Sequence, residues 1–92
     1  LNYLRLAHYP PDEADRLRRF LATQGVATVL DPIDNGRFHN VYAVNRGVSA
    51  DELQSVGVQF KRKMKLIGQR WKQQKNGGDA LETMIFVKYK GS

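Results

Sequence analysis

SADELQSVGVQFKRKMKLIGQRWKQQK, residues 49–75, is the longest strongly periodic stretch of this 92-residue chain. Its apolar residues recur at steps of three and four, which keeps them on one stripe of an α-helix. These residues are Leu53, Val56, Phe60, Met64, Ile67 and Trp71. Ser49 and Glu52 stand three residues apart at its start, the spacing of a capping box. The stretch therefore predicts one long helix that begins near Ser49 and buries one apolar stripe.

The second half of this predicted helix is cationic. From residue 61 onward it contains no acidic residue, and its cations lie at many angles outside the apolar stripe. They are Lys61, Arg62, Lys63, Lys65, Arg70, Lys72 and Lys75. Such a surface could bind a nucleic acid, another anionic polymer or an anionic lipid surface. The alternative is a helix face that is exposed only to water.

The predicted helix is also too long for the sheet that it must cover. Unbroken over residues 50–75 it would span ~39 Å, whereas strands of five or six residues cover ~18 Å. We expect a break or distortion at Gly57; the alternative is that the end around Trp71 projects past the sheet. Gly57 and Gly68 lie beside the apolar stripe, where they would let the first helix or the sheet approach closely.

Size and composition predict a single small domain over residues 1–92. Hydrophobic residues make up 41% of the chain and charged residues 26%, with a net charge of +6. The absence of cysteine excludes a disulfide framework and cysteine metal sites. No apolar run approaches the ~20 residues of a membrane-spanning helix. Because Leu1 is not an initiator Met, we expect the chain to be part of a longer protein.

The other segments complete a βαββαβ order. We predict strands at 2–7, 26–30, 38–44 and 83–89, a first helix at 12–24, and loops at 45–48 and 76–79. Gly25 supplies the stop of the first helix, and Asn35 with Gly36 a tight reversal between strands. Asp31 and Pro32 are expected to end the second strand. Right-handed crossovers then place both helices on one face of a four-stranded antiparallel sheet, a ferredoxin-like α+β sandwich.

Alternation along the strands predicts which side chains face the helices. We place Val41 and Ala43 inward on the third strand, and Ile85 and Val87 inward on the fourth. The expected core comprises Leu4, Leu6, Leu17, Leu21, Val29, Val41, Phe60, Met64, Ile67 and Val87. The expected open face of the sheet shows Tyr3, Arg5, Asn40, Tyr42, Phe86 and Lys88.

Catalytic, metal-binding and cofactor-binding patterns are not found in the sequence. We expect His8 in a loop and His39 in a strand. Neither has a carboxylate at a spacing typical of metal ligands or of a catalytic pair, which disfavours a metal site for the two histidines. No serine stands in a nucleophile motif, and no phosphate loop or dinucleotide fingerprint is present. We therefore expect a non-enzymatic domain without a cofactor.

Three kinds of binding remain open from the residues alone. Aromatic and cationic side chains on an open sheet suit single-stranded nucleic acid, together with the basic surface of Lys61, Arg62, Lys65, Arg70 and Lys72. The same rings and amides suit sugars, whose CH faces pack on aromatic rings. Leu66 and Val58, on the outer side of the long helix, suit a protein partner or a homodimer. The remaining interpretation is that these side chains are exposed strand-forming residues that bind no ligand.

Two segments resemble the SPOR (sporulation-related repeat) family. NYLRLAHYPPDEADRLRRFLATQGVATVL, residues 2–30, is similar to the family's first strand, Ala-rich helix and Ala-x-Val strand, and NVYAVNRGVSADEL, residues 40–53, to its Arg-Val-x-Val-Gly-Pro-Phe segment and second helix. The matching positions of the first segment are Tyr3, Leu4, Arg5, Leu6, Ala7, His8, Tyr9, Ala14, Leu21, Gly25, Ala27 and Val29. The chain departs from the family pattern where Arg5 replaces Gln, Ala7 and His8 replace Gly and Ser, and Val44, Asn45 and Arg46 replace Gly, Pro and Phe.

This resemblance implies a βαββαβ module of a bacterial cell-envelope or cell-division protein, in the periplasm or cell envelope. It implies that the module binds peptidoglycan, favouring glycan strands without stem peptides, on the open face of the sheet. Matched onto this chain, the glycan-binding positions would be Arg5, Asn40 and Tyr42, together with Tyr3.

Overall fold

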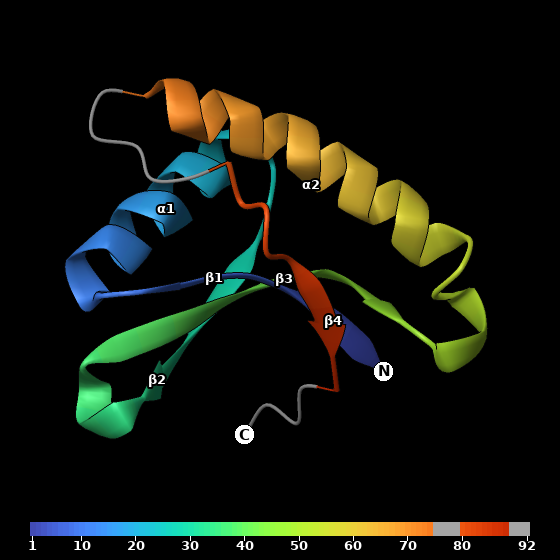
Figure 1. Cartoon of the computed structure of the whole chain (residues 1–92), viewed down its shortest axis with the longest axis horizontal. Helices are drawn as coiled ribbons and strands as arrows, with labels where there is room; N and C mark the ends of the chain where they lie inside the picture. Colours follow the sequence, from blue (N-terminus) through green and yellow to red (C-terminus); the bar gives the residue numbers. More distant parts are fainter. Residues whose placement is uncertain (75–79, 89–92) are drawn as a thin grey trace.

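The structure of the chain is a computed structural model that describes residues 1–74 and 80–88. Its elements are β1 (Asn2–Tyr9), α1 (Pro11–Thr23), β2 (Thr28–Ile33), the 3-10 turn η1 (Asp34–Gly36), β3 (Phe38–Val48), the 3-10 turn η2 (Ala50–Glu52), α2 (Val56–Gln73) and β4 (Ile85–Val87). The strands form one antiparallel sheet in the order β2-β3-β1-β4. Both helices lie on the same side of it (Figure 1). The predicted ferredoxin-like α+β sandwich is confirmed. The loop predicted at 76–79 and the end of the predicted last strand at Tyr89 lie outside the described residues.

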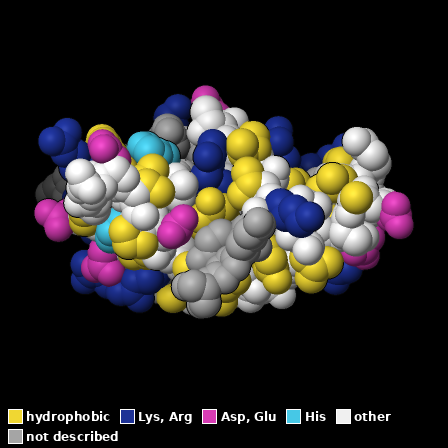
Figure 2. All heavy atoms as spheres, turned by 90° about the horizontal axis from the view of Figure 1, so that it is seen from below, with side chains coloured by type: hydrophobic (Ala, Val, Ile, Leu, Met, Phe, Trp, Pro, Cys, Tyr) yellow, Lys and Arg dark blue, Asp and Glu magenta, His cyan; other side chains and the backbone are white. Residues whose placement is uncertain are grey.

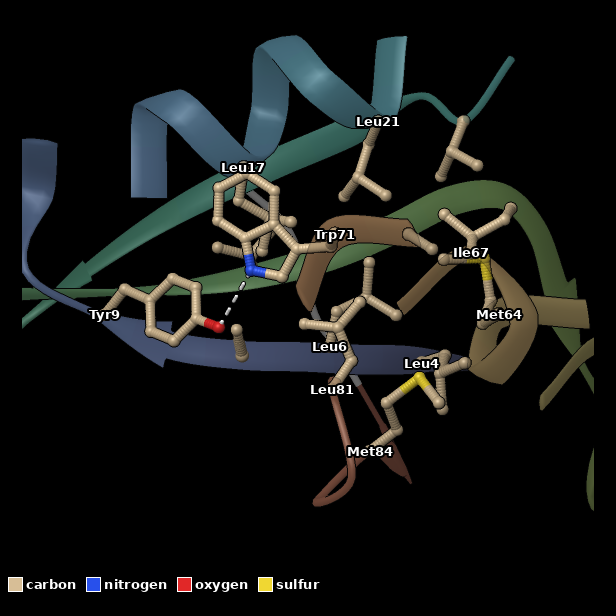
Figure 3. Packing of buried hydrophobic residues seen from close by; sticks show 14 of the residues in the cluster. Leu4, Leu6, Tyr9, Leu17, Leu21, Met64, Ile67, Trp71, Leu81 and Met84 are labelled. Carbon is tan, nitrogen blue, oxygen red and sulfur yellow. Dashed lines mark hydrogen bonds between the residues drawn. The ribbon is translucent and has the colours of Figure 1, made fainter. Parts of the chain in front are cut away.

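The hydrophobic core lies between the sheet and the two helices (Figure 3). Seven of the ten expected core residues are fully or almost fully buried: Leu4, Leu6, Leu17, Leu21, Val41, Met64 and Ile67. Val29, Phe60 and Val87 are only half-buried. Phe60 packs against the edge of the core, and on β2 Leu30, not Val29, takes the inward position because it lies opposite Val41.

Trp71 connects the C-terminal end of α2 to the sheet and to α1. It is 3% exposed, and its indole Nε1 donates a hydrogen bond to the Tyr9 hydroxyl at 3.3 Å (Figure 3). Its ring centroid lies 5.4 Å from that of Phe20. Tyr9 comes from β1 and Phe20 from α1. The far end of α2 is therefore anchored, although the stripe of apolar residues alone did not identify its partners.

The predicted long helix is divided before Gly57. Ser49 and Glu52 form the expected capping contacts, with the Ser49 backbone N–H donating to Glu52 Oε1 at 3.2 Å, but these contacts close η2. The same hydrogen bond is the main reason why the pKa of Glu52 lies below its ordinary value. The chain then departs from helical geometry at Ser55 (φ −119°, ψ −83°) before α2 begins. A continuous helix of ~39 Å would exceed the longest dimension of the molecule, 36 Å, and the break removes that excess.

The two glycines of α2 allow close approach of the C-terminal segment. The contact at Gly57 is with β4 of the sheet, as expected, whereas the contact at Gly68 is with Ala80, which lies in neither the first helix nor the sheet. A Cβ on Gly68 would clash with the Ala80 carbonyl oxygen, and a Cβ on Gly57 would lie 3.2 Å from Cε2 of Phe86. Leu81, which follows the contact at Gly68, is fully buried and holds a positive φ of 59°. The packing against Gly68 therefore involves backbone, whereas that against Gly57 involves a ring.

The second and third strands extend further than predicted. β2 continues through Asp31 and Pro32, because an edge strand has an unpaired side on which proline's missing N–H costs no ladder bond. β3 continues to Val48, which pairs with Asn2, so the expected loop at 45–48 is wrong. The reversal between the two strands is confirmed, with Asn35 and Gly36 at φ 56° and 83°.

The facing predicted for β4 is inverted. Phe86 lies opposite the buried Leu4 and packs against the core, whereas Ile85 lies opposite Arg5 on the other face and is 44% exposed. Val87, opposite Tyr3, shares the open face with Ile85. Alternation alone allows both facings, and the close packing of Phe86 against Gly57 accounts for the one adopted.

Candidate functional site

The face of the sheet turned away from the helices carries the predicted site residues. Figure 2 views the molecule from this side and shows hydrophobic, cationic, acidic and histidine side chains mixed on its surface. Opposite residues of antiparallel strands share a face, so the register defines which side chains meet there. Arg5 lies opposite Tyr42 on β3 and opposite Ile85 on β4, and Tyr42 lies opposite Val29 on β2. These four side chains form one row across the sheet.

A second row is polar and runs across three strands. Asn40 lies opposite His8 on one side and opposite Asp31 on the other. His8 Nδ1 is 3.1 Å from Asn40 Oδ1, and this contact is a hydrogen bond when Nδ1 carries the proton. The His8 ring also stacks on Phe38, with ring centroids 4.7 Å apart and planes inclined by 25°. The imidazole is therefore oriented by an amide on one strand and by a ring near the hairpin.

A β-bulge brings His8 to this face. The pairing of β1 with β3 shifts between Arg5 and Ala7, so that Leu6 and Ala7 together oppose Val41. Both residues are buried, and the alternation resumes with His8 on the open side. The expectation that His8 lies in a loop is wrong, because β1 extends to Tyr9.

All four residues that the SPOR resemblance implies lie on this face. Arg5 and Tyr42 are direct cross-strand neighbours, Asn40 neighbours His8, and Tyr3 lies opposite Val87 at the far end. Their exposure is uneven: Tyr3 and Arg5 are half-buried, whereas Asn40 and Tyr42 expose only 8% and 6% of their surfaces. Tyr42 therefore offers little ring surface for stacking, and the more accessible rings are those of Tyr3 and Phe38.

Two other residues expected on the open face are placed differently. Phe86 faces the core. Lys88 is exposed but follows the last residue of β4, so no strand pairing fixes its direction. The aromatic surface of the open face is consequently smaller than predicted, and Ile85 and Val87 add aliphatic surface instead.

The basic surface predicted on the long helix lies on the opposite side of the molecule. Arg62, Lys65, Arg70 and Lys72 are exposed and Lys61 is half-buried, all on α2 (Figure 1). Arg70 donates a hydrogen bond to Gln24 Oε1 at 2.8 Å. The structure therefore does not bring these cations together with Tyr3, Phe38 and Arg5.

The two histidines are also separated. His39 lies opposite Tyr9, whose side chain is in the core, so His39 and His8 project from opposite faces of the sheet. Among residues 1–74 and 80–88, no group of three or more His, Asp or Glu side chains is arranged to hold a metal ion. Within the same residues, no helix is both long and apolar enough to cross a bilayer.

Comparisons with protein-family models, with curated protein sequences and with solved structures find no match to this chain.

Proposed function

We propose that this domain is a non-catalytic module that binds polysaccharide strands on the open face of its sheet. The glycan strands of bacterial peptidoglycan are the ligand to which the SPOR resemblance points. The module would then act in the periplasm or cell envelope, as part of a cell-envelope or cell-division protein.

The observation that carries this proposal is the polar row of His8, Asn40 and Asp31 beside Arg5, bordered by Phe38 and Tyr3. Imidazole, carboxylate and guanidinium groups bind sugar hydroxyls as donors or acceptors. Accessible rings at two places on the same face provide surfaces for the CH groups of sugar rings. The two rows set the Asp31 carboxylate and the Arg5 guanidinium on the same face, and such a mixture of charges suits a ligand of low charge density better than a polyphosphate.

Single-stranded nucleic acid receives less support than sugar. Proteins that bind single strands combine a cationic track with stacking rings on one surface. Here most cations of α2 are exposed on the helix side of the molecule, whereas the accessible rings lie on the sheet side.

The test is retention of the domain on purified peptidoglycan from which an amidase has removed the stem peptides. Arg5→Ala with His8→Ala removes two hydrogen-bonding groups from the open face and is expected to weaken retention by at least about tenfold. Tyr42→Ala is avoided, because Tyr42 is 6% exposed and its loss would disturb the fold. The matched control is Arg62→Ala with Gln69→Ala, which also removes one cation and one polar side chain, but from exposed positions on α2.

Wild type and control should be retained equally. The amidase leaves one lactyl carboxylate per disaccharide, a much lower charge density than that of a nucleic acid, so added salt should weaken retention only mildly. Thermal unfolding of each variant reports whether the fold is kept. Equal retention of wild type and the Arg5/His8 variant would refute the site. Failure of the wild type to bind would refute the function.

A further inference from the structure

The outer surface of α2 carries positive charge that no described acidic side chain balances. Six of the eighteen residues of the helix are cations, and none is acidic: Lys61, Arg62, Lys63, Lys65, Arg70 and Lys72. The ion pairs between described residues join Asp15 to Arg18 and Arg19, and Glu52 to Arg46, and so leave the α2 cations out. Such a concentration of like charge favours a polyanionic partner.

The middle of this surface is apolar rather than aromatic. Leu66 is 61% exposed and lies among the cations, and Val58, in the first turn of the helix, is 37% exposed. Phe60 and Trp71, the aromatic residues of α2, pack on the core side instead. Among the described residues, the outer surface of α2 therefore has no ring on which a nucleic acid base could stack. Its exposed leucine would gain no favourable contact from a phosphate backbone.

We propose that the outer surface of α2 binds the surface of an anionic lipid bilayer. The helix, ~27 Å long, lies along the membrane, with its Lys and Arg head groups at the lipid phosphates. The aliphatic stems of these side chains and Leu66 reach the boundary between headgroups and acyl chains. Two exposed aliphatic side chains are too few for deep insertion, so binding depends mainly on charge.

This surface lies on the opposite side of the molecule from the open face of the sheet (Figure 1). The proposal does not depend on the proposed glycan function, and the two surfaces are tested separately.

The experiment measures sedimentation of the domain with vesicles of phosphatidylcholine alone or of phosphatidylcholine mixed with phosphatidylglycerol. Binding is expected only to the mixed vesicles and is expected to fall steeply as salt is added. Each basic residue near an anionic surface contributes about 1 kcal/mol, so Arg62→Gln with Lys65→Gln should weaken the partition about thirtyfold. The control Arg37→Gln with Lys88→Gln removes the same charge from exposed positions away from α2 and should change the partition less than about threefold.

A third variant, Leu66→Gln, leaves the charge unchanged and should weaken binding several-fold, because it removes the apolar contact. All five positions changed on α2 or in the control are exposed, and circular dichroism confirms that each variant is folded. Equal loss in the α2 variant and the control would show a dependence on net charge alone and would overturn the proposal. Absence of binding to the mixed vesicles, or tighter binding to single- or double-stranded DNA at the same salt, would overturn it too.

Discussion

Gly68→Ala tests the closest contact between α2 and the C-terminal segment. The new methyl group would overlap the Ala80 carbonyl oxygen and would stand 2.9 Å from the Ala80 carbonyl carbon and 3.1 Å from Leu81 Cβ. Real Cβ atoms do not approach oxygen so closely, and the contacting atoms belong to backbone. The segment must therefore move away, and it carries the fully buried Leu81 and, three residues later, Met84.

The expected cost follows from two opposing effects. Adding a methylene-sized group to a well-packed core costs about 1 to 3 kcal/mol, and a backbone clash belongs near the upper end. Replacing Gly by Ala inside a helix contributes about 1 kcal/mol in the other direction. We expect Gly68→Ala to lower the free energy of unfolding by about 2 kcal/mol, equivalent to a fall in Tm of roughly 8 to 16 °C for a domain of this size.

Gly57→Ala is the matched control. Its methyl group would lie 3.2 Å from a ring carbon of the half-buried Phe86, which can shift by the few tenths of an ångström required. The helix gain then offsets the contact, and the free energy of unfolding should change by less than about 1 kcal/mol. Urea unfolding followed by circular dichroism measures both variants. Equal effects of the two substitutions, or a stabilising Gly68→Ala, would refute the close backbone packing.

Three further changes test the packing and the η2 turn. In urea unfolding, Phe86→Ala should destabilise the domain by about 2 to 4 kcal/mol, because the Phe86 ring packs on the core. Ile85→Ala should cost less than about 1 kcal/mol, because the Ile85 side chain is 44% exposed. The reverse ranking would support the facing of β4 that was expected from the sequence. Because the pKa of Glu52 is lowered, its carboxylate stabilises the fold at neutral pH, and this contribution disappears as pH falls below the ordinary value of 4.5. The stability difference between wild type and Glu52→Gln should therefore shrink on acidification, and a difference constant with pH would contradict this assignment. Trp71→Phe removes the hydrogen bond to Tyr9 and part of a buried ring, so a loss of about 1 to 3 kcal/mol is expected in thermal unfolding, and an unchanged Tm would show that this contact contributes little.

The order of elements and most of the core were predictable because they depend on local patterns. The period of the apolar residues in α2, the Gly25 stop and the Asn35–Gly36 reversal are each encoded within a few residues. The capping contacts of Ser49 and Glu52 were also predicted, but they did not show that the helix would be interrupted three residues later. The comparison of helix length with strand length did predict an interruption, at Gly57, and the chain departs from helical geometry two residues earlier, at Ser55.

The composition of the open face was less predictable because it depends on strand pairing. Arg5, Asn40 and Tyr42 were placed on the correct face, but the depth at which Asn40 and Tyr42 lie is set by neighbouring strands. For the short strand β4, Phe86 and Ile85 could be exchanged without violating alternation. The pairing of Phe86 with the buried Leu4 and the contact of Phe86 with Gly57 distinguish the two facings.

The bulge at Leu6 and Ala7 divides β1 into two numbering frames. Odd-numbered residues face the open side up to Arg5, and even-numbered residues do so from His8 onward. An alignment of this strand with an unbulged strand therefore needs a gap of one position between Arg5 and His8. Without that gap, the alignment would place the buried Ala7 on the open, ligand-binding face and the exposed His8 in the core.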